Sequence, residues 1–276
     1  MDIENIFTLA QKEMRDARRN RWFVLYTIAF TGLSLALAWM ALSGAGQYGL
    51  AGFGRTSASM VNLVLLIVPL MGLTLGALSL AGERESGSLL YLLAQPISQS
   101  EVMMGKFIGL SAALVAALSL GFGVTAVFIA TNGGGAEVST YLILLLLACL
   151  LALGSLSLGF LLSAMVQKGS TAVGLALFLW LILVFFGDLG VMSSALTLQF
   201  SVEQLLAVTL INPLQIFKIA AVLDIRNNLE VLGPAGMYAF RTYGSQLLPL
   251  LITLLLIWII VPFVAAQYLF QKRGVL

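Results

Sequence analysis

The stretch Glu83-Arg84-Glu85-Ser86-Gly87-Ser88 is a charged and polar interruption in a sequence that is otherwise strongly apolar. Of the 276 residues, 60% are hydrophobic and only 9% are charged, whereas soluble domains carry about 25% charged residues. Each helical crossing of a membrane needs about 20 apolar residues. The composition therefore predicts an all-α integral membrane protein in which this stretch connects two spans.

The apolar runs on both sides of this stretch, and those further along the chain, predict six transmembrane helices within a single domain, 1–276. The expected bounds are 22–42, 60–81, 105–130, 141–166, 170–187 and 247–270. Only Gln167-Lys168-Gly169 separates the fourth run from the fifth, which indicates a tight hairpin. The first run is longer than the roughly 7–15 apolar residues of a secretory signal, so we interpret it as an uncleaved anchor.

The distribution of basic residues predicts the orientation of the spans. With the N-terminus inside, ten of the fourteen lysines and arginines lie on the cytoplasmic side, in accord with the positive-inside rule. Six spans return the C-terminus to that side. We therefore expect a multi-pass protein of the bacterial inner membrane with both termini in the cytoplasm.

Residues 1–21 predict an amphipathic helix on the cytoplasmic membrane surface. Its apolar residues recur at steps of three and four, which is the helical period. Its polar face is basic, which suits contact with lipid headgroups. The alternative is an ordinary solvated helix. The basic residues that we assign to this interfacial helix are Lys12, Arg15, Arg18 and Arg19.

Residues 82–104 predict a cytoplasmic loop that contains a short helix. Gly87 is suited to ending the second span, and Ser98 with Glu101 has the spacing of a capping box that starts the third. Between them, Leu89, Leu92 and Leu93 form an apolar face, which we expect to contact a partner while the preceding charges fix the register. An ordinary polar turn is the alternative. The residues assigned to this coupling site are Glu83, Arg84, Glu85, Gly87, Ser88, Leu89, Leu92, Leu93 and Pro96.

Residues 188–246 predict a structured outer segment between the last two spans. Ser201 and Gln204 have capping-box spacing at the start of a helix. Asn212-Pro213 ends that helix, and a second amphipathic helix follows. Such helices either lie on the outer leaflet or dock an external partner.

Small residues at four-residue spacing predict close helix packing within the membrane. The pairs Gly72–Gly76 and Gly105–Gly109 have GxxxG spacing. Ser155, Gly159 and Ser163 continue the pattern in the fourth span.

The sequence offers little chemistry of its own. It has no histidine and one cysteine, so neither an internal disulfide framework nor a metal site of the usual ligands is expected. The span interiors carry no charge, with Lys106 assigned to the cytoplasmic edge, which disfavours an ion-coupled transporter. Gly105-Lys106 lacks the remainder of a P-loop. We therefore expect no cofactor in this chain and no enzymatic activity, with ATP and Mg²⁺ bound by a separate subunit.

The motifs described above resemble those of the ABC-2 type permease family. The resemblance rests on residues 83–89, Leu92-Leu93, Pro96 and Gly105-Lys106, together with the N-terminal helix and Asn212-Pro213. The family usually has threonine where Ser88 stands. Overall length and the last outer segment most resemble the members that help mature nitrous oxide reductase.

The resemblance implies a permease without nucleic-acid partners that works as a homodimer. It also implies two copies of a cytoplasmic ATPase, membrane lipid and a periplasmic accessory protein of a copper-centre assembly system. The transported species, copper, sulfur or none, stays open. An exporter of a lipid, drug or glycan and a non-transporting membrane scaffold are the alternatives. The residues expected to meet the periplasmic partner are Asn212, Pro213, Phe217 and Lys218.

Overall fold

The structure is a computed structural model that describes residues 2–43, 52–132, 138–197, 201–226 and 233–273. Within these ranges the side chains of 41–43, 52–58, 138–140, 186–197, 225–226, 233–235 and 273 are not described. The described residues form helices and no strand, which confirms the all-α prediction. Parts of the connections expected at 43–59 and 131–140, and of the outer segment 188–246, lie outside the described residues.

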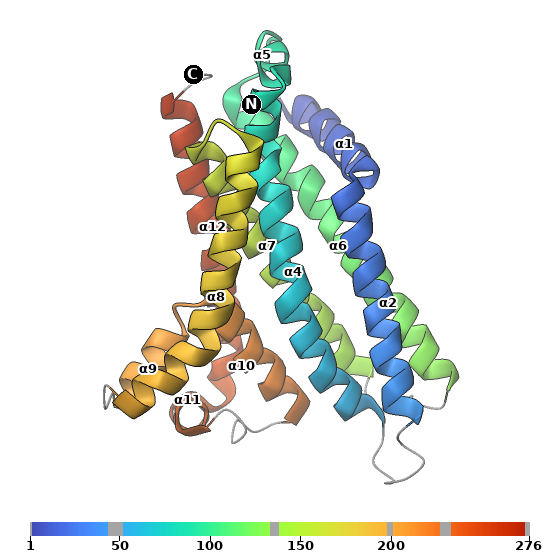
Figure 1. The fold of residues 1–276 in the computed structure, drawn as a ribbon, viewed down its shortest axis with the longest axis vertical. Coiled ribbons are helices and arrows are strands. Elements are labelled where there is room, and N and C mark those ends of the chain that lie inside the picture. Colours follow the sequence, from blue (N-terminus) through green and yellow to red (C-terminus); the bar gives the residue numbers. More distant parts are fainter. Residues whose placement is uncertain (1, 44–51, 133–137, 198–200, 227–232, 274–276) are drawn as a thin grey trace.

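The helices run between two ends of the molecule (Figure 1). Helices α1 and α5 and both chain termini lie at one end, here called the α5 end, and α9, α10 and α11 lie at the opposite end. The elements in chain order are α1 (Ile3–Arg19), α2 (Arg21–Ser43), α4 (Gly52–Glu85), α5 (Ser88–Leu93), α6 (Gln99–Thr131), α7 (Val138–Met165), α8 (Gly169–Thr197), α9 (Val202–Thr209), α10 (Pro213–Arg226), α11 (Gly233–Tyr243), the 3₁₀ turn Gly244–Gln246 and α12 (Leu247–Arg273).

Five helices contain stretches that are long and apolar enough to cross a membrane: α2, α4, α6, α7 and α12. Helix α8 extends beside α4 toward the opposite end (Figure 1). Its described apolar part, Gly169–Phe185, would span roughly 26 Å at 1.5 Å per residue, close to the thickness of the hydrocarbon core. Helices α9 and α10 meet at 108° and lie together at the opposite end (Figure 1).

Glycines allow α4 and α7 to pack with their backbones in contact. A Cβ atom on Gly72 would lie 2.7 Å from the carbonyl oxygen of Ala152, and one on Gly159 would lie 2.8 Å from the Cα of Gly76. The buried Ser163 hydroxyl adds a polar link, because it donates to the Ala77 carbonyl at 2.7 Å. Lipid gives helices little hydrophobic reason to associate, so such close packing and hydrogen bonding hold them together.

The second glycine pair positions α1 rather than another span. A Cβ on Gly105 would lie 2.6 Å from the Cβ of Leu9, and one on Gly109 would lie 2.7 Å from the Cβ of Glu13. The predicted N-terminal helix is therefore present and packs along the start of α6. Its apolar stripe is divided, because Leu9 and Ala10 are buried whereas Phe7 is 71% exposed. Its location on a membrane surface stays a prediction.

Candidate coupling site at the end of α4

Two residues, Ser86 and Gly87, separate the long helix α4 from the short helix α5, and Gly87 is left-handed. Helix α4 ends at Glu85, and Gly87 has a φ of +73°, a backbone conformation that residues other than glycine rarely adopt. Helix α6 then starts at a complete capping box, in which Ser98 and Glu101 bond each other's backbone N–H groups. Both helix boundaries confirm the predictions from the sequence, and they hold α5 between two fixed breaks.

Glu83, the first charge before this break, connects α4 to α6 and α1. Its Oε1 lies 2.7 Å from Lys106 Nζ, and the same Nζ donates to Glu13 Oε1, also at 2.7 Å. Lys12 Nζ lies 3.6 Å from Glu83 Oε1 and 3.7 Å from Glu13 Oε1. Lys106 is only 1% exposed, so its charge lies inside the helix bundle beside the end of α4 and does not face water. Its charge is buried because the two carboxylates replace the water it loses.

Arg84 connects α4 to the last turn of α7 and to α12. Its Nη1 donates to the Ser163 carbonyl at 3.2 Å and to the Val166 carbonyl at 3.0 Å. The carbonyls at a helix C-terminus have no partner within the helix and carry partial negative charge, so a guanidinium is a favourable partner. The guanidinium also lies over the ring of Phe270 on α12, 5.6 Å from its centroid.

Glu85 connects α4 to the beginning of α8. Its Oε2 accepts a hydrogen bond from the Gly169 N–H at 2.8 Å. The N–H groups of the first helical turn lack helical partners and carry partial positive charge, so a carboxylate stabilises this end. Three consecutive side chains, Glu83 to Glu85, thus link the end of α4 to five other helices: α1, α6, α7, α8 and α12.

These contacts change the role predicted for the charges and leucines of the loop. We expected the leucines to face a partner, yet Leu89 is fully buried, and Leu92 and Leu93 pack against the chain's own core. The opposite face of α5 exposes Leu90 by 60% and Tyr91 by 81%. An i, i+3, i+4 pattern marks the buried face of a helix and does not identify what buries it. Leu90 and Tyr91 lie outside that pattern, and their large side chains could have indicated which face of the helix is exposed.

The remaining loop residues lie at the two ends of α5, where the Ser88 hydroxyl also donates to the Glu83 carbonyl of α4 at 3.4 Å. Ser88 is exposed, and its Oγ lies 2.9 Å from Ser86 Oγ. Pro96 is exposed after the end of α5. At the start of α6, Glu101 Oε1 also accepts from the Asp2 N–H at 2.6 Å. The beginning of α1 is thereby fixed to the same loop.

The basic residues assigned to the N-terminal helix divide into two groups. Lys12 belongs to the cluster of Glu83, Lys106 and Glu13 described above. Arg15, Arg18 and Arg19 are exposed.

The outer residues assigned to a partner lie mainly inside the chain. Phe217 is fully buried and Pro213 is buried, so neither side chain is accessible to a partner in this structure. Asn212 starts α10, because its Oδ1 accepts from the Leu214 N–H at 3.0 Å while its Nδ2 donates to the Leu183 carbonyl at 2.6 Å. Lys218 is half-buried. The assignment of Phe217 and Pro213 as contacts is therefore corrected. A contact elsewhere in this segment stays a prediction.

The sequence is similar to known proteins along nearly its whole length. The family model described as ABC-2 family transporter protein matches residues 7–275. The probable ABC transporter permease protein NosY of Stutzerimonas stutzeri is 30% identical over 278 aligned residues, covering 98% of this chain and 99% of the relative. The protein of the same name from Pseudomonas aeruginosa is 32% identical over 224 residues, covering 78% of this chain and 80% of the relative.

In the described part of the chain, no group of three or more His, Cys, Asp or Glu side chains is arranged to hold a metal ion.

The helical membrane architecture, the loop motif and the match along nearly the whole sequence agree with one another. The chain belongs to the ABC-2 family of transporter permeases.

Proposed function

We propose that this protein is the membrane subunit of an ABC transporter, and that a separate cytoplasmic ATPase drives it through α5. The observation that carries the proposal is the attachment of Glu83, Arg84 and Glu85 to the surrounding helices immediately before α5. A force applied to α5 would be passed through these contacts to several spans at once. The α5 end is then cytoplasmic, in the orientation that the basic residues favour.

The exposed face of α5 supplies the contact for the ATPase. Leu90 and Tyr91 present large, mostly hydrophobic surfaces to the outside. A tyrosine that becomes buried at a protein interface commonly contributes a large share of the binding energy. ATP and Mg²⁺ bind to the ATPase in this scheme. Two ATPase subunits require two such loops, which a homodimer of this chain provides.

The similarity to the two NosY permeases extends the proposal to a biological role. In this role the subunit acts in copper-centre assembly of nitrous oxide reductase. It passes the ATP-driven movement to its opposite end, where a periplasmic accessory protein binds. The hydrogen bond from Asn212 to the Leu183 carbonyl supports this route, because it joins the outer helices to α8, and Glu85 joins α8 to the α5 loop.

The exchange of Tyr91 for alanine tests the contact between α5 and the ATPase. We expect Tyr91→Ala to weaken association of the ATPase by about tenfold or more, as loss of a central interface residue does. ATP hydrolysis by the reconstituted complex would fall accordingly. Tyr268→Ala is the matched control, since Tyr268 is a similarly exposed tyrosine (62%) on α12. Equal ATPase binding and hydrolysis in both variants would refute the docking role.

The copper role is tested separately in cells that produce nitrous oxide reductase. Cells without this permease should accumulate the enzyme with a reduced copper content, and cells that express Tyr91→Ala should do the same. A normal copper content without the permease would refute this role. The ATPase measurements would still stand in that case.

A further inference from the structure

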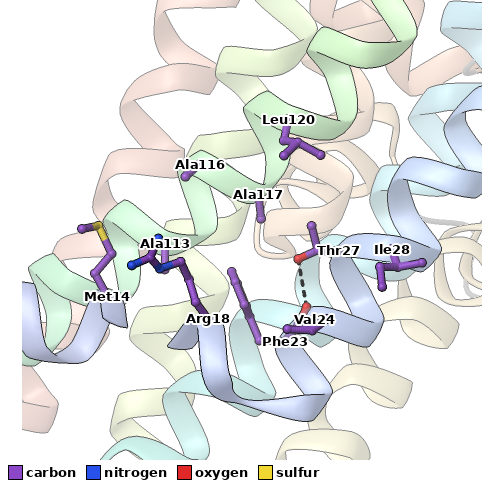
Figure 2. A pocket seen from close by; sticks show the side chains of 10 residues that line it. All are labelled: Met14, Arg18, Phe23, Val24, Thr27, Ile28, Ala113, Ala116, Ala117 and Leu120. Carbon is purple, nitrogen blue, oxygen red and sulfur yellow. Dashed lines mark hydrogen bonds between the residues drawn. The ribbon is translucent and has the colours of Figure 1, made fainter. Parts of the chain in front are cut away.

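A hollow on the side of the molecule lies between the second half of α1, the start of α2 and the middle of α6 (Figure 2). Its volume is about 360 Å³. The small side chains of Ala113, Ala116 and Ala117 form the wall on α6, and Phe23 and Ile28 belong to the wall on α2. Phe23 is buried beneath the hollow, whereas Ile28 is 67% exposed at its border.

One end of the hollow is cationic and the remainder is apolar. Arg18 is the only charged residue in its lining, and Figure 2 shows the guanidinium extending between Met14 and Phe23 toward α6. The lining also contains the hydroxyl of Thr27, which is already satisfied because it donates to the Phe23 carbonyl at 2.9 Å. A ligand that fits this lining has an anionic group joined to a hydrocarbon.

Two further arginines increase the positive charge at this end. Arg19 and Arg21 line an adjacent hollow on α2 that shares Val24 and Ile28 with the first. Among the residues that the structure describes, no carboxylate lies within 4.0 Å of Arg18, Arg19 or Arg21. The cluster of three arginines therefore has unused capacity to bind an anion.

The hollow is long enough to hold about two thirds of an acyl chain's path through one membrane leaflet. It extends along α6 from Ala113 to Leu120, which corresponds to about 10 Å at 1.5 Å per residue. Half of the hydrocarbon core is about 15 Å thick. The arginines lie where α1 meets α2, at the α5 end of the α2 span, and the alanine wall continues into the span of α6.

We propose that this hollow binds an anionic phospholipid from the leaflet at the α5 end. The phosphate pairs with Arg18, supported by Arg19 and Arg21, and one acyl chain lies against the alanines of α6. In the orientation proposed above this is the cytoplasmic leaflet. The bound lipid joins α1 to α2 and α6, so it stabilises the helix that carries Glu13 of the buried charge cluster.

A second copy of this chain is a weaker candidate for the occupant. It would have to place a carboxylate against Arg18, because a guanidinium enclosed without a partner is costly. At this end of the molecule Glu13, Glu83, Glu85 and Glu101 are already engaged within the chain, so a second copy would have to present the exposed Glu4 or Asp16 of its α1. An anionic lipid supplies the missing charge directly.

Native mass spectrometry of the full-length protein tests the proposal, with phosphatidylglycerol and phosphatidylcholine of identical acyl chains as the probes. We expect tight binding of phosphatidylglycerol and weaker binding of phosphatidylcholine. Arg18→Gln should lower phosphatidylglycerol affinity by about fivefold, the effect of one basic residue at an anionic surface. Arg15→Gln removes the same charge from an exposed residue of α1 outside the lining and should leave the affinity nearly unchanged.

A second pair of variants tests the apolar part of the site independently of charge. Ala116→Trp fills the hollow and should reduce the number of retained lipids. Ala112→Trp places the same side chain at an exposed position of α6 outside the lining and should not. Equal losses for Arg18→Gln and Arg15→Gln would refute the site, as would full lipid retention by Ala116→Trp. A loss of dimers in Ala116→Trp with lipid binding intact would instead assign the hollow to a second copy.

Discussion

Replacing Lys106 by methionine is expected to destabilise the protein by about 3 kcal/mol. Its ammonium group lies 2.7 Å from the carboxylates of both Glu13 and Glu83 and is 1% exposed. Methionine retains much of the apolar stem but leaves the two carboxylates facing each other. Removing one partner of a buried ion pair typically costs about 3–5 kcal/mol. We expect the lower value, because Glu83 is 21% exposed and Lys12 stays within 4 Å of both carboxylates.

Unfolding of the purified permease in mixed micelles, followed by circular dichroism, measures this cost. The triple variant Glu13→Gln, Glu83→Gln, Lys106→Met separates charge from packing, since it removes all three charges. We expect it to recover a large part of the lost stability, because the penalty arises from carboxylates left without a counter-charge. If the triple variant is as unstable as Lys106→Met, the stabilisation comes from packing of the lysine stem and the reasoning is wrong.

Three further changes test other parts of the structure. Gly109→Leu should displace α1 from α6, because even a Cβ at Gly109 lies 2.7 Å from Glu13 Cβ, and faster proteolysis of the N-terminal segment would report it. Gly87→Val should cost about 1–2 kcal/mol in unfolding free energy, since φ is +73° there. Gly123→Val should cost less, because Gly123 is helical and an added Cβ would meet nothing within 4 Å. Arg84→Gln should cost about 2 kcal/mol in the same measurement, because the carbonyls at the end of α7 lose their partner. In the complex, the ATPase should stay bound to this variant, but its ATP hydrolysis should become independent of the permease.

Local sequence signals predicted the helices and their boundaries well. Gly87 ends the second span as expected, and the boxes at Ser98 and Ser201 are both formed. Such features depend on residues within one turn of each other, so they can be recognised without knowledge of the fold. Gly72 and Gly76 likewise indicated close packing, although the sequence did not identify α7 as the partner.

The candidate site was predicted less accurately because its contacts are distant in sequence. Glu83, Arg84 and Glu85 bind residues that lie between 23 and 186 positions away along the chain, at Lys106, Ser163, Gly169 and Phe270. No local pattern distinguishes charges that meet a partner protein from charges that join neighbouring helices. For the same reason, the sequence did not show that α5 packs its leucines inward or that Lys106 pairs with Glu13 and Glu83. The buried Phe217 was likewise assigned to an outer contact.

The most direct test of the central claim is photo-crosslinking from α5 in the intact complex with its ATPase. A benzophenone amino acid is placed at Tyr91, which is 81% exposed at the tip of the loop, or at Leu146, which is 53% exposed on the span of α7. We expect a covalent adduct with the ATPase from position 91 and none from position 146. No adduct from position 91 in a complex that hydrolyses ATP would contradict the proposal that the ATPase drives this permease through α5.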